Sequence, residues 1–221
     1  MAFGLLIPLC YLMGSVPSGL LITKLVRRID VRQYGSGNTG MTNVMRTVGV
    51  WPAMVVLVLD VGKGILAVIL AKIINPSPSL EVAVALSVLI GHNWSIFLRF
   101  KGGKGSATGI GSLCALSPLA GLIMMAVGLP FISVFKYVSL GSIIGAVTAI
   151  VSMLLLALFA PSLPLGVPSL TYVLYPAIGA PIVLFKHRGN IARLIKGQEH
   201  KMHRASNIKD TSLEHSEDAS G

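Results

Sequence analysis

Apolar segments of membrane-spanning length alternate with short polar stretches along most of this chain. The hydrocarbon core of a bilayer is about 30 Å thick, and an α-helix needs about 17 to 25 residues to cross it. Five apolar segments satisfy this requirement, at 2–23, 51–73, 82–98, 140–160 and 169–185. The pattern therefore predicts an all-α integral membrane protein.

The apolar stretch at 105–135 is flanked by basic residues, with Lys101 and Lys104 before it and Lys136 after it. Basic residues favour the cytoplasmic side, so both of its ends are predicted inside and the chain must cross an even number of times. We expect two short helices here, separated at Ser117-Pro118 or at Gly128-Leu-Pro130. The alternative is one long helix, which would place Lys136 on the opposite side from the other basic stretches. Two helices bring the expected number of transmembrane helices to seven.

The sidedness follows from the charges that come directly after the first segment, which are Lys24, Arg27, Arg28 and Arg32. They predict an outside N-terminus and cytoplasmic residues 24–46, and seven crossings then leave the C-terminus in the cytoplasm. The first segment has no basic stretch before it, so we expect it to be a retained helix rather than a cleaved signal. Residues 1–209 are predicted to form a single domain, followed by a polar, disordered tail at 210–221.

Composition supports this class, because 53% apolar and 12% charged residues depart strongly from a soluble domain. The net charge of +10 indicates cytoplasmic loops that face anionic lipid. A nucleic-acid partner is disfavoured because the chain has no basic soluble domain with interleaved aromatic residues. Cys10 and Cys114 lie in apolar stretches without paired Cys or His residues, so we expect no disulfide, metal or cofactor.

The first of three polar motifs is GSGNTGMTNVMR at 35–46, which we call motif 1. Its glycines and Asn38 tolerate left-handed backbone, and Thr42 or Asn43 is placed to cap a following helix. Such a loop can direct N–H groups and hydroxyls at an anion, and Arg46 offers a planar fork suited to phosphate. A flexible turn with a cytoplasmic arginine explains the composition equally well. The candidate phosphate-binding residues are Ser36, Gly37, Asn38, Thr39, Gly40, Asn43 and Arg46.

Motif 2, FKGGKGSATG at 100–109, has only two glycines between its lysines. This spacing lets backbone amides approach a phosphate while the ammonium groups neutralise it. The motif is not a nucleotide P-loop, because Leu98 and Gly105 occupy the places of the required Gly and Ser or Thr. The alternative is a basic loop that contacts lipid headgroups. Its candidate phosphate-binding residues are Lys101, Gly102, Gly103, Lys104 and Gly105.

Motif 3, KHRGNIARLIKG at 186–197, follows the last apolar segment. A His beside an amide is suited to holding a hydroxyl or accepting its proton, which makes His187 and Asn190 candidates. An interface anchor is the alternative for His187. Arg193 and Lys196 belong to an amphipathic sequence that is expected to lie along the membrane interface.

Three further polar residues are interpreted as structural. Asp60 and Lys63 are three positions apart in an apolar helix and can therefore form an ion pair that lessens the cost of their burial. His92, which precedes Asn93-Trp94, is expected at the aromatic belt of the interface or in a packed polar contact.

In these motifs the chain resembles the bacterial acyl-phosphate:glycerol-3-phosphate acyltransferase family, the PlsY type, and the resemblance extends over nearly its whole length. The resemblance rests on motif 1, on GHNWSIFLRFKGGKGSAT at 91–108 and on HRGNIARLIKGQE at 187–199. Met41, Ser95 and Ser106 stand where the family usually has Ala, Pro and Val. None of these differences removes a polar group that is expected at the site.

The resemblance implies a seven-helix enzyme of the bacterial inner membrane whose site faces the cytoplasm. Its reaction in phospholipid biosynthesis would move a fatty acyl group from acyl phosphate to the 1-hydroxyl of sn-glycerol 3-phosphate, giving lysophosphatidic acid and phosphate. By this resemblance Ser36, Arg46 and one of Lys101 and Lys104 bind phosphate. His187 and Asn190 handle the glycerol moiety together with Ser139 or Ser142, and Glu199 is structural. The catalytic residues would be Ser36, Arg46, His187 and Asn190, with either His187 or the acceptor's own phosphate as the base.

Two other classes of protein are alternatives to the enzyme. A membrane transporter of phosphate or a phosphorylated small molecule would also use cationic glycine-rich loops. Its binding residues should converge near the bilayer midplane, and its halves often repeat, whereas the cations here gather on one face. An acyltransferase that uses acyl-CoA is disfavoured because no His is followed five positions later by Asp.

Overall fold

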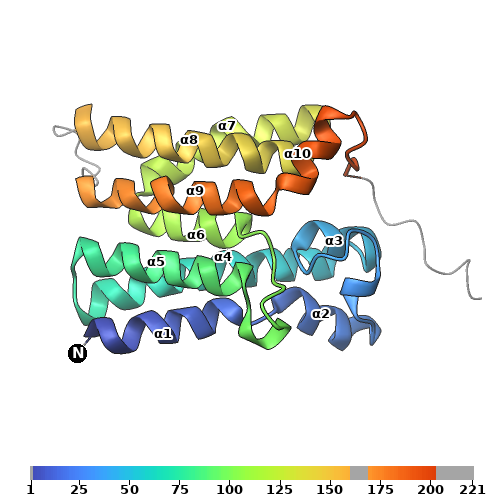
Figure 1. The fold of residues 1–221 in the computed structure, drawn as a ribbon, viewed down its shortest axis with the longest axis horizontal. Helices are drawn as coiled ribbons and strands as arrows, with labels where there is room; N and C mark the ends of the chain where they lie inside the picture. Colours follow the sequence, from blue (N-terminus) through green and yellow to red (C-terminus); the bar gives the residue numbers. More distant parts are fainter. Residues whose placement is uncertain (1, 160–168, 203–221) are drawn as a thin grey trace, which may run out of the picture.

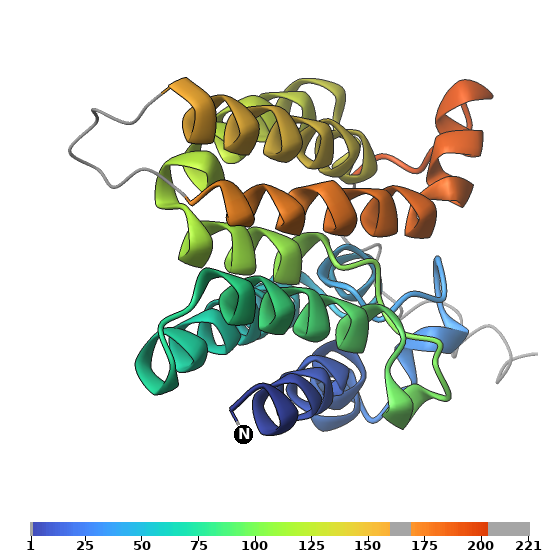
Figure 2. The same ribbon diagram turned by 60° about the vertical axis from the view of Figure 1, so that its left-hand side comes forward.

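Helices account for most of residues 2–159 and 169–202, which the computed structural model describes, and the long ones lie side by side as a bundle (Figures 1 and 2). The α-helices are α1 (Ala2–Ser15), α2 (Ser18–Arg27), α3 (Met41–Thr47), α4 (Val50–Ile74), α5 (Pro78–Asn93), α6 (Ser106–Leu116), α7 (Pro118–Phe135), α8 (Val138–Phe159), α9 (Leu174–Lys186) and α10 (Arg188–Ile195). Three 3-10 turns join them, η1 (Val31–Gln33), η2 (Ile96–Leu98) and η3 (Leu170–Val173). The predicted tail at 210–221 lies outside the described residues.

Within residues 2–159 and 169–202, five helical segments are long and apolar enough to cross a membrane, which confirms the expected all-α membrane architecture. They are Gly4–Arg27, Val50–Ile74, Pro78–Leu98, Pro118–Phe135 and Val138–Phe159. Two shorter apolar segments, Ser106–Leu116 and Leu170–Lys186, lie within the same bundle. The boundaries of α4 and α8 agree with the apolar segments 51–73 and 140–160 to within two residues.

The first apolar segment is not one continuous helix, because α1 ends before Val16-Pro17 and α2 begins after it. Proline has no N–H and disfavours helical backbone in the residue before it. Two carbonyl groups at the break receive side-chain partners from elsewhere in the bundle. Ser95 Oγ donates to Ser15 O at 2.5 Å and Lys63 Nζ donates to Val16 O at 3.4 Å. The break is therefore a polar point inside an apolar bundle.

Two helices occupy the stretch 105–135, and Ser117-Pro118 is the junction between them. Ser117 Oγ accepts from Ala120 N at 3.4 Å, and Pro118 takes the first position of α7, where a missing N–H costs nothing. Pro130 lies inside α7 and does not end it. The expectation that both helices are short was wrong for α7, whose 18 residues reach spanning length.

Small residues let the helices approach closely at the centre of the bundle. A Cβ added at Gly64 of α4 would lie 2.3 Å from Thr108 O, and one at Gly111 of α6 would lie 2.1 Å from Val61 O. Close approach at small residues is a usual way for helices to pack within a membrane, where hydrophobic burial alone drives little association. The α4–α6 pair thereby sets the position of motif 2, which leads directly into α6.

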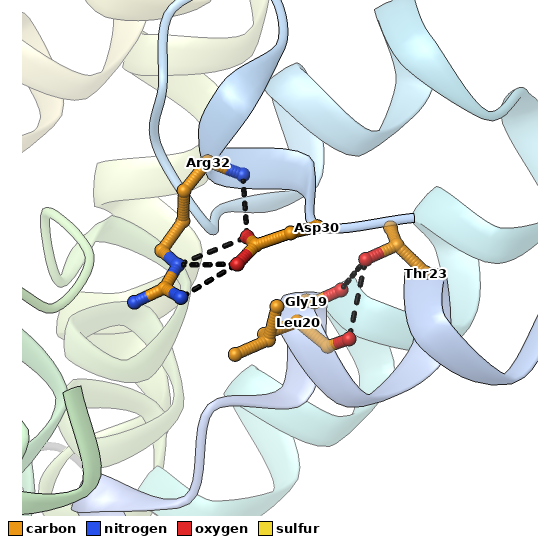
Figure 3. Close-up of polar contacts among 5 residues, drawn as sticks. All are labelled: Gly19, Leu20, Thr23, Asp30 and Arg32. Atoms are coloured by element: carbon orange, nitrogen blue, oxygen red, sulfur yellow. Dashed lines mark hydrogen bonds and ion pairs between the residues drawn. The ribbon is translucent and has the colours of Figure 1, made fainter. Parts of the chain in front are cut away.

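The segment between α2 and motif 1 has a path fixed by local hydrogen bonds (Figure 3). Thr23 Oγ1 donates to Gly19 O at 2.9 Å within α2, which ends where Arg28 adopts left-handed backbone at φ 56°. Asp30 then accepts from the backbone N of Arg32 at 3.0 Å and from its guanidinium at 2.6 Å. The bond to the Arg32 side chain lowers the pKa of Asp30 to about 2, so this carboxylate stays charged at neutral pH. The backbone between α2 and motif 1 therefore has a defined conformation.

Candidate functional site

The three motifs meet at the end of the bundle opposite the N-terminus (Figure 1). Motif 1 forms a loop and α3, motif 2 connects η2 with α6, and motif 3 forms the end of α9 together with α10. In Figure 2, α10 turns away from the axis of α9, as expected for an amphipathic helix at the end of a span. Segments far apart in the sequence thus contribute to one region.

Asn43 shapes the loop of motif 1 from within. Its Nδ2 lies 2.9 to 3.1 Å from the carbonyl oxygens of Val31, Tyr34 and Asn38, and its Oδ1 accepts from Ser36 N at 2.9 Å. The side chain is only 2% exposed. Both ends of the Asn43 amide are therefore engaged within the loop, and they hold the Ser36 region in place.

The helix cap of motif 1 differs from the sequence expectation. Neither Thr42 nor Asn43 caps α3, because the capping position is Gly40, which makes no side-chain bond and has extended backbone at φ −76°. Asn38 Oδ1 accepts from Gly40 N at 2.9 Å and stabilises the turn before the helix. Left-handed backbone occurs at Gly35 (φ 58°) and Gly37 (φ 67°), where glycine is favoured.

Glu199 joins motif 2 and motif 3 through Asn190. Lys104 Nζ donates to Asn190 Oδ1 at 2.5 Å, and Asn190 Nδ2 donates to Glu199 Oε1 at 2.7 Å. Ser139 Oγ reaches the same oxygen at 2.9 Å, and Arg193 Nε reaches Oε2 at 2.8 Å. Burial alone would raise the pKa of Glu199, but the bonds from Asn190, Ser139 and Arg193 outweigh it, and the pKa is lowered. Glu199 therefore acts as a charged anchor for this cluster.

The C-terminal strap, residues 199–202, runs from this cluster to Arg46. Arg46 Nη2 donates to His200 O at 2.8 Å and to Lys201 O at 3.3 Å, and Met202 N donates to Lys136 O at 2.7 Å. Arg46 Nε is buried and has no hydrogen-bond partner among residues 2–159 and 169–202. Motif 1 is thus connected to motif 3 through the strap.

His187 is 3% exposed and has a defined orientation. Its Nδ1 lies 2.8 Å from Val183 O, and because a carbonyl only accepts, Nδ1 carries the proton of the neutral ring. Nε2 is then the acceptor nitrogen. Burial lowers the pKa of His187 to about 4, against the Val183 bond that favours the charged ring. At neutral pH this side chain is a neutral hydrogen-bond acceptor.

Positive charge dominates the region around Lys104. Burial lowers the pKa of Lys104 to about 8 against the attraction of Glu199, and Arg193, Arg46 and Lys186 lower it further by repulsion. Lys104 thus lies among three other cations and one carboxylate, which is an arrangement that attracts anions. Within the described part of the chain, no three His, Cys, Asp or Glu side chains are grouped to hold a metal ion.

The two glycines between the lysines of motif 2 pack against His92. Gly103 N donates to His92 O at 2.9 Å, and a Cβ at Gly103 would lie 2.1 Å from His92 Nε2. A Cβ at Gly102 would lie 2.2 Å from His92 O. These glycines are therefore required for packing whatever the loop binds. Lys101 is exposed, and Gly105 adopts left-handed backbone at φ 84° directly before α6.

An apolar pocket opens beside motifs 2 and 3, between α5, α6, α7, α8 and α9. It encloses about 380 Å³, part of it open to the surroundings. Val183 in its wall lies one turn before His187, and Ser106 in its wall follows motif 2's Gly105. Further lining residues include Leu89, Leu113, Ser142, Ala146 and Tyr175. Of the two candidate serines of α8, Ser142 lines this pocket and Ser139 binds Glu199.

Two residues with clear contacts at this end had no role assigned from the sequence. Lys186 Nζ donates to Asn93 O at 2.9 Å and lies 5.3 Å from the centre of the Trp94 ring. Ser95 Oγ donates to Ser15 O at the break between α1 and α2. A single lysine at the end of a span resembles any interface charge, and only the tertiary structure brings it to Asn93. No local signal marks Ser95, because its partner, Ser15 O, lies 80 positions away.

Comparison with known proteins places these features in a family. The family model described as glycerol-3-phosphate acyltransferase matches residues 4–197. A glycerol-3-phosphate acyltransferase of Thermoanaerobacter pseudethanolicus is 43% identical over 201 residues, covering 91% of this chain and 96% of the relative. A glycerol-3-phosphate acyltransferase of Desulforamulus reducens is 45% identical over 192 residues, covering 87% of this chain and 91% of the relative.

Two solved structures have the same fold. The crystal structure of PlsY, an integral membrane glycerol 3-phosphate acyltransferase, in its glycerol 3-phosphate form has a TM-score of 0.82 and 33% identity. That match covers 92% of this chain and 96% of the other. The lysophosphatidic acid form of PlsY has a TM-score of 0.79 and covers 91% of this chain and 95% of the other. The chain therefore belongs to the glycerol-3-phosphate acyltransferase family.

Proposed function

We propose that this protein transfers a fatty acyl group from acyl phosphate to the 1-hydroxyl of sn-glycerol 3-phosphate, giving lysophosphatidic acid and phosphate for phospholipid biosynthesis. The observation that carries the proposal is the arrangement of one cationic region directly beside one apolar pocket. Acyl phosphate combines an anionic headgroup with an apolar chain, and these two surfaces match its two parts. The relatives named glycerol-3-phosphate acyltransferase support the choice of acceptor.

The phosphate groups are assigned to motif 1, Arg46 and Lys104. A buried donor without a partner is costly, and a phosphate oxygen at Arg46 Nε would remove that cost. Lys104 uses its ammonium group on Asn190 Oδ1 and has further N–H donors for a second acceptor. The loop held by Asn43 presents the Ser36 region to the same anion. Lys101 is exposed, so Lys104 is the better of the two lysines for a buried phosphate.

The glycerol moiety is assigned to His187, Asn190 and Ser142. His187 Nε2 can accept a hydrogen bond from a hydroxyl, and Asn190 is held in one orientation by Lys104 and Glu199. Ser139 is occupied by Glu199, which leaves Ser142, in the pocket wall, as the serine available to a substrate. This arrangement would bring a hydroxyl next to the mouth of the apolar pocket.

In the proposed reaction the hydroxyl oxygen attacks the carbonyl carbon of the acyl phosphate. The bond between that carbon and the phosphate oxygen breaks, and phosphate leaves with the electron pair. Positioning the two substrates can supply roughly 7 to 11 kcal/mol of the barrier in favourable cases. The hydroxyl proton needs an acceptor, and His187, whose pKa is about 4, is a weak one. A phosphate monoester, with a second pKa of about 6, is the stronger base, so we assign proton removal to the acceptor's phosphate and hydroxyl positioning to His187.

The same site implies an orientation in the membrane. We propose seven crossings, made by the five long segments together with α6 and the segment Leu170–Lys186. The N-terminus would be outside, and the site would face the cytoplasm at the inner membrane of a bacterium. Basic residues of α2 and the loops gather at the motif end, and Met202 N binds Lys136 O there. A cysteine in place of Lys136, in a chain without Cys10 and Cys114, should resist impermeant thiol reagents in intact cells. Labelling of that cysteine would contradict this orientation.

Purified protein in detergent, incubated with acyl phosphate and labelled glycerol 3-phosphate, tests the reaction. Labelled lysophosphatidic acid should appear together with an equal amount of inorganic phosphate, and the product should decrease sharply with Arg46→Ala or Ser36→Ala. Acylation from acyl-CoA but not from acyl phosphate would contradict the proposed donor. Uptake of labelled glycerol 3-phosphate into proteoliposomes without acylation would indicate a transporter.

A further inference from the structure

The break between α1 and α2 lies directly against both phosphate-binding loops. A Cβ added at Gly19, next to the break, would lie 1.7 Å from Thr39 O of motif 1. On the other side, His92 packs against Gly102 and Gly103 of motif 2. A small polar pocket lies between these contacts, and its walls include Ser15, Ser18, Thr39, Asp60, His92 and Gly102. The two loops therefore rest on a shared set of buried residues.

Asp60 of α4 is the common partner within this set. Its Oδ1 lies 2.8 Å from Lys63 Nζ, 3.0 Å from Ser18 Oγ and 3.7 Å from His92 Nδ1. The side chains of Asp60, Lys63 and His92 are 4%, 7% and 10% exposed. A buried carboxylate is stable only when charges and hydrogen bonds compensate it, so its partners are held to it in turn.

Lys63 connects this cluster to the break itself. Its ammonium group pairs with Asp60 and also donates to Val16 O, a carbonyl at the break that accepts from Ser18 N at 3.1 Å as well. Backbone groups within a membrane must be satisfied by the protein, because lipid offers them no hydrogen bonds. The ion pair thus fixes the start of α2, where Ser18 and Gly19 support motif 1.

We propose that Asp60, with Ser18 and His92, is a positioning cluster that holds motif 1 and motif 2 in register for the phosphate groups. This inference rests on the proposed assignment of both loops to phosphate binding. One line of contacts runs from Asp60 through Ser18 and Gly19 to Thr39. A second runs from Asp60 through His92 to Gly103. A displacement of about 1 Å in such supports can reduce catalysis by about 10²-fold even far from the reacting atoms.

A similar buried carboxylate at the opposite end of the bundle provides a control. Glu81 is 4% exposed, accepts a hydrogen bond from Tyr172 Oη at 2.5 Å and lies 3.9 Å from Lys72 Nζ. Tyr172→Phe and Ser18→Ala each remove one hydroxyl donor from a buried carboxylate. They differ in distance from the loops, which separates positioning from general stability.

The test measures KM for both substrates, kcat and the thermal unfolding temperature of each variant in detergent. Ser18→Ala should remain folded and raise KM for at least one phosphorylated substrate by about 3- to 10-fold, the scale of one typical hydrogen bond. Tyr172→Phe should lower the unfolding temperature about as much as Ser18→Ala does, but it should leave KM unchanged. Ser18→Thr, which keeps the hydroxyl, should restore most of the lost affinity. His92→Asn keeps a donor near the Nδ1 position and removes the ring that packs against Gly103. It therefore tests the contact with motif 2 separately, and we expect the same rise in KM as for Ser18→Ala.

Wild-type KM values in both folded Ser18→Ala and His92→Asn, or an equal rise in KM in Tyr172→Phe, would overturn the inference. Arg46→Ala, measured in parallel, distinguishes this failure from failure of the site assignment. If Arg46→Ala impairs turnover while the cluster variants do not, the phosphate site stands and the positioning cluster is wrong. If Arg46→Ala is also unimpaired, the assignment of motif 1 to phosphate is wrong.

Discussion

The ammonium group of Lys104 lies 2.5 Å from Oδ1 of Asn190, although 86 positions separate the two residues. This bond joins a glycine-rich loop before α6 to the first turn of α10. Asn190 is fixed from its other side by Glu199, so Lys104 has a defined place beside His187 rather than the freedom of a surface lysine. Its pKa, lowered to about 8 by burial and by neighbouring cations, makes its charge sensitive to mildly alkaline pH.

Substrate binding should therefore weaken above about pH 8, because Lys104 loses its proton and no longer attracts phosphate. A bound anion raises the pKa of Lys104, so kcat/KM should decrease at lower pH than kcat. Kinetics between about pH 6.5 and 9.5 measure this, in a range where the second phosphate proton, with a pKa of about 6, is already mostly lost. Lys104→Arg keeps the charge throughout and should show no decrease near pH 8, whatever its rate. The same decrease in that variant would exclude Lys104 as its origin.

His187 should have little influence on the pH dependence of the rate. Its pKa of about 4 leaves it neutral over the physiological range. His187→Gln should lower kcat, since the hydroxyl loses its acceptor, while kcat/KM keeps the wild-type profile between about pH 6 and 8. A wild-type inflection in that range that disappears in His187→Gln would show that His187 is the base after all.

The same pKa predicts an effect on stability at acidic pH. The unfolded chain binds a proton at His187 near the ordinary pKa of 6.5, whereas the folded protein binds it only near 4. Stability is then unaffected above pH 6.5 and is lost as the pH falls, by about 2 kcal/mol between pH 6.5 and 5. Thermal unfolding in detergent across this range should show a smaller loss for His187→Gln than for the wild type. Equal losses would indicate that the buried ring takes up its proton near pH 6.5.

The sequence anticipated the features that depend on local composition. Apolar length located α4 and α8 to within two residues, and charge on both sides of 105–135 required the pair α6 and α7. The break in the first segment was missed because Pro17 alone does not distinguish a kinked helix from an interrupted one. The helix can be interrupted there because Lys63 and Ser95 supply hydrogen bonds to the carbonyl groups of Val16 and Ser15. These donors lie 47 and 80 positions away from the carbonyls that they bind.

The candidate site was anticipated in its residue types but not in its connections. Glycine-rich basic loops indicated phosphate, and the structure brings Lys104 to Asn190 and Arg46 to the C-terminal strap. The inward role of Asn43 could not be read from its neighbours, because its four side-chain bonds reach residues that lie 5 to 12 positions earlier in the chain. Such contacts depend on the path of the backbone, which composition does not specify.

Glu199 should be the main contributor to stability at the site. Glu199→Ala leaves the donors of Asn190 and Ser139 unpaired and removes the carboxylate that pairs with Arg193 and attracts Lys104. We expect a loss of about 1 to 3 kcal/mol, together with a decrease in kcat/KM as Asn190 loses its orientation. Arg193→Gln removes a partner whose side chain is 36% exposed and should cost clearly less. Calibrated thermal unfolding of both variants compares them, and an equal cost would contradict the role of Glu199 as the anchor.

Ala146 in the wall of the apolar pocket provides a test of where the acyl chain lies. Ala146 is 5% exposed and lines the pocket, so Ala146→Phe would fill space that the chain is proposed to occupy. Each CH₂ group kept out of an apolar site costs about 0.8 kcal/mol, and displacing two of them corresponds to about a tenfold loss in kcat/KM for a long-chain donor. Val147→Phe, at a neighbouring position that is 48% exposed, adds the same ring outside the pocket and should leave that value unchanged. The ratio of long-chain to short-chain acyl phosphate turnover reports the effect, because a short donor does not need the filled space. If Ala146→Phe lowered turnover of both donors equally, the substitution would have disturbed the fold of the site. A second variant at Gly179, in the same wall, would then have to show the chain-length effect for the pocket to remain the acyl site.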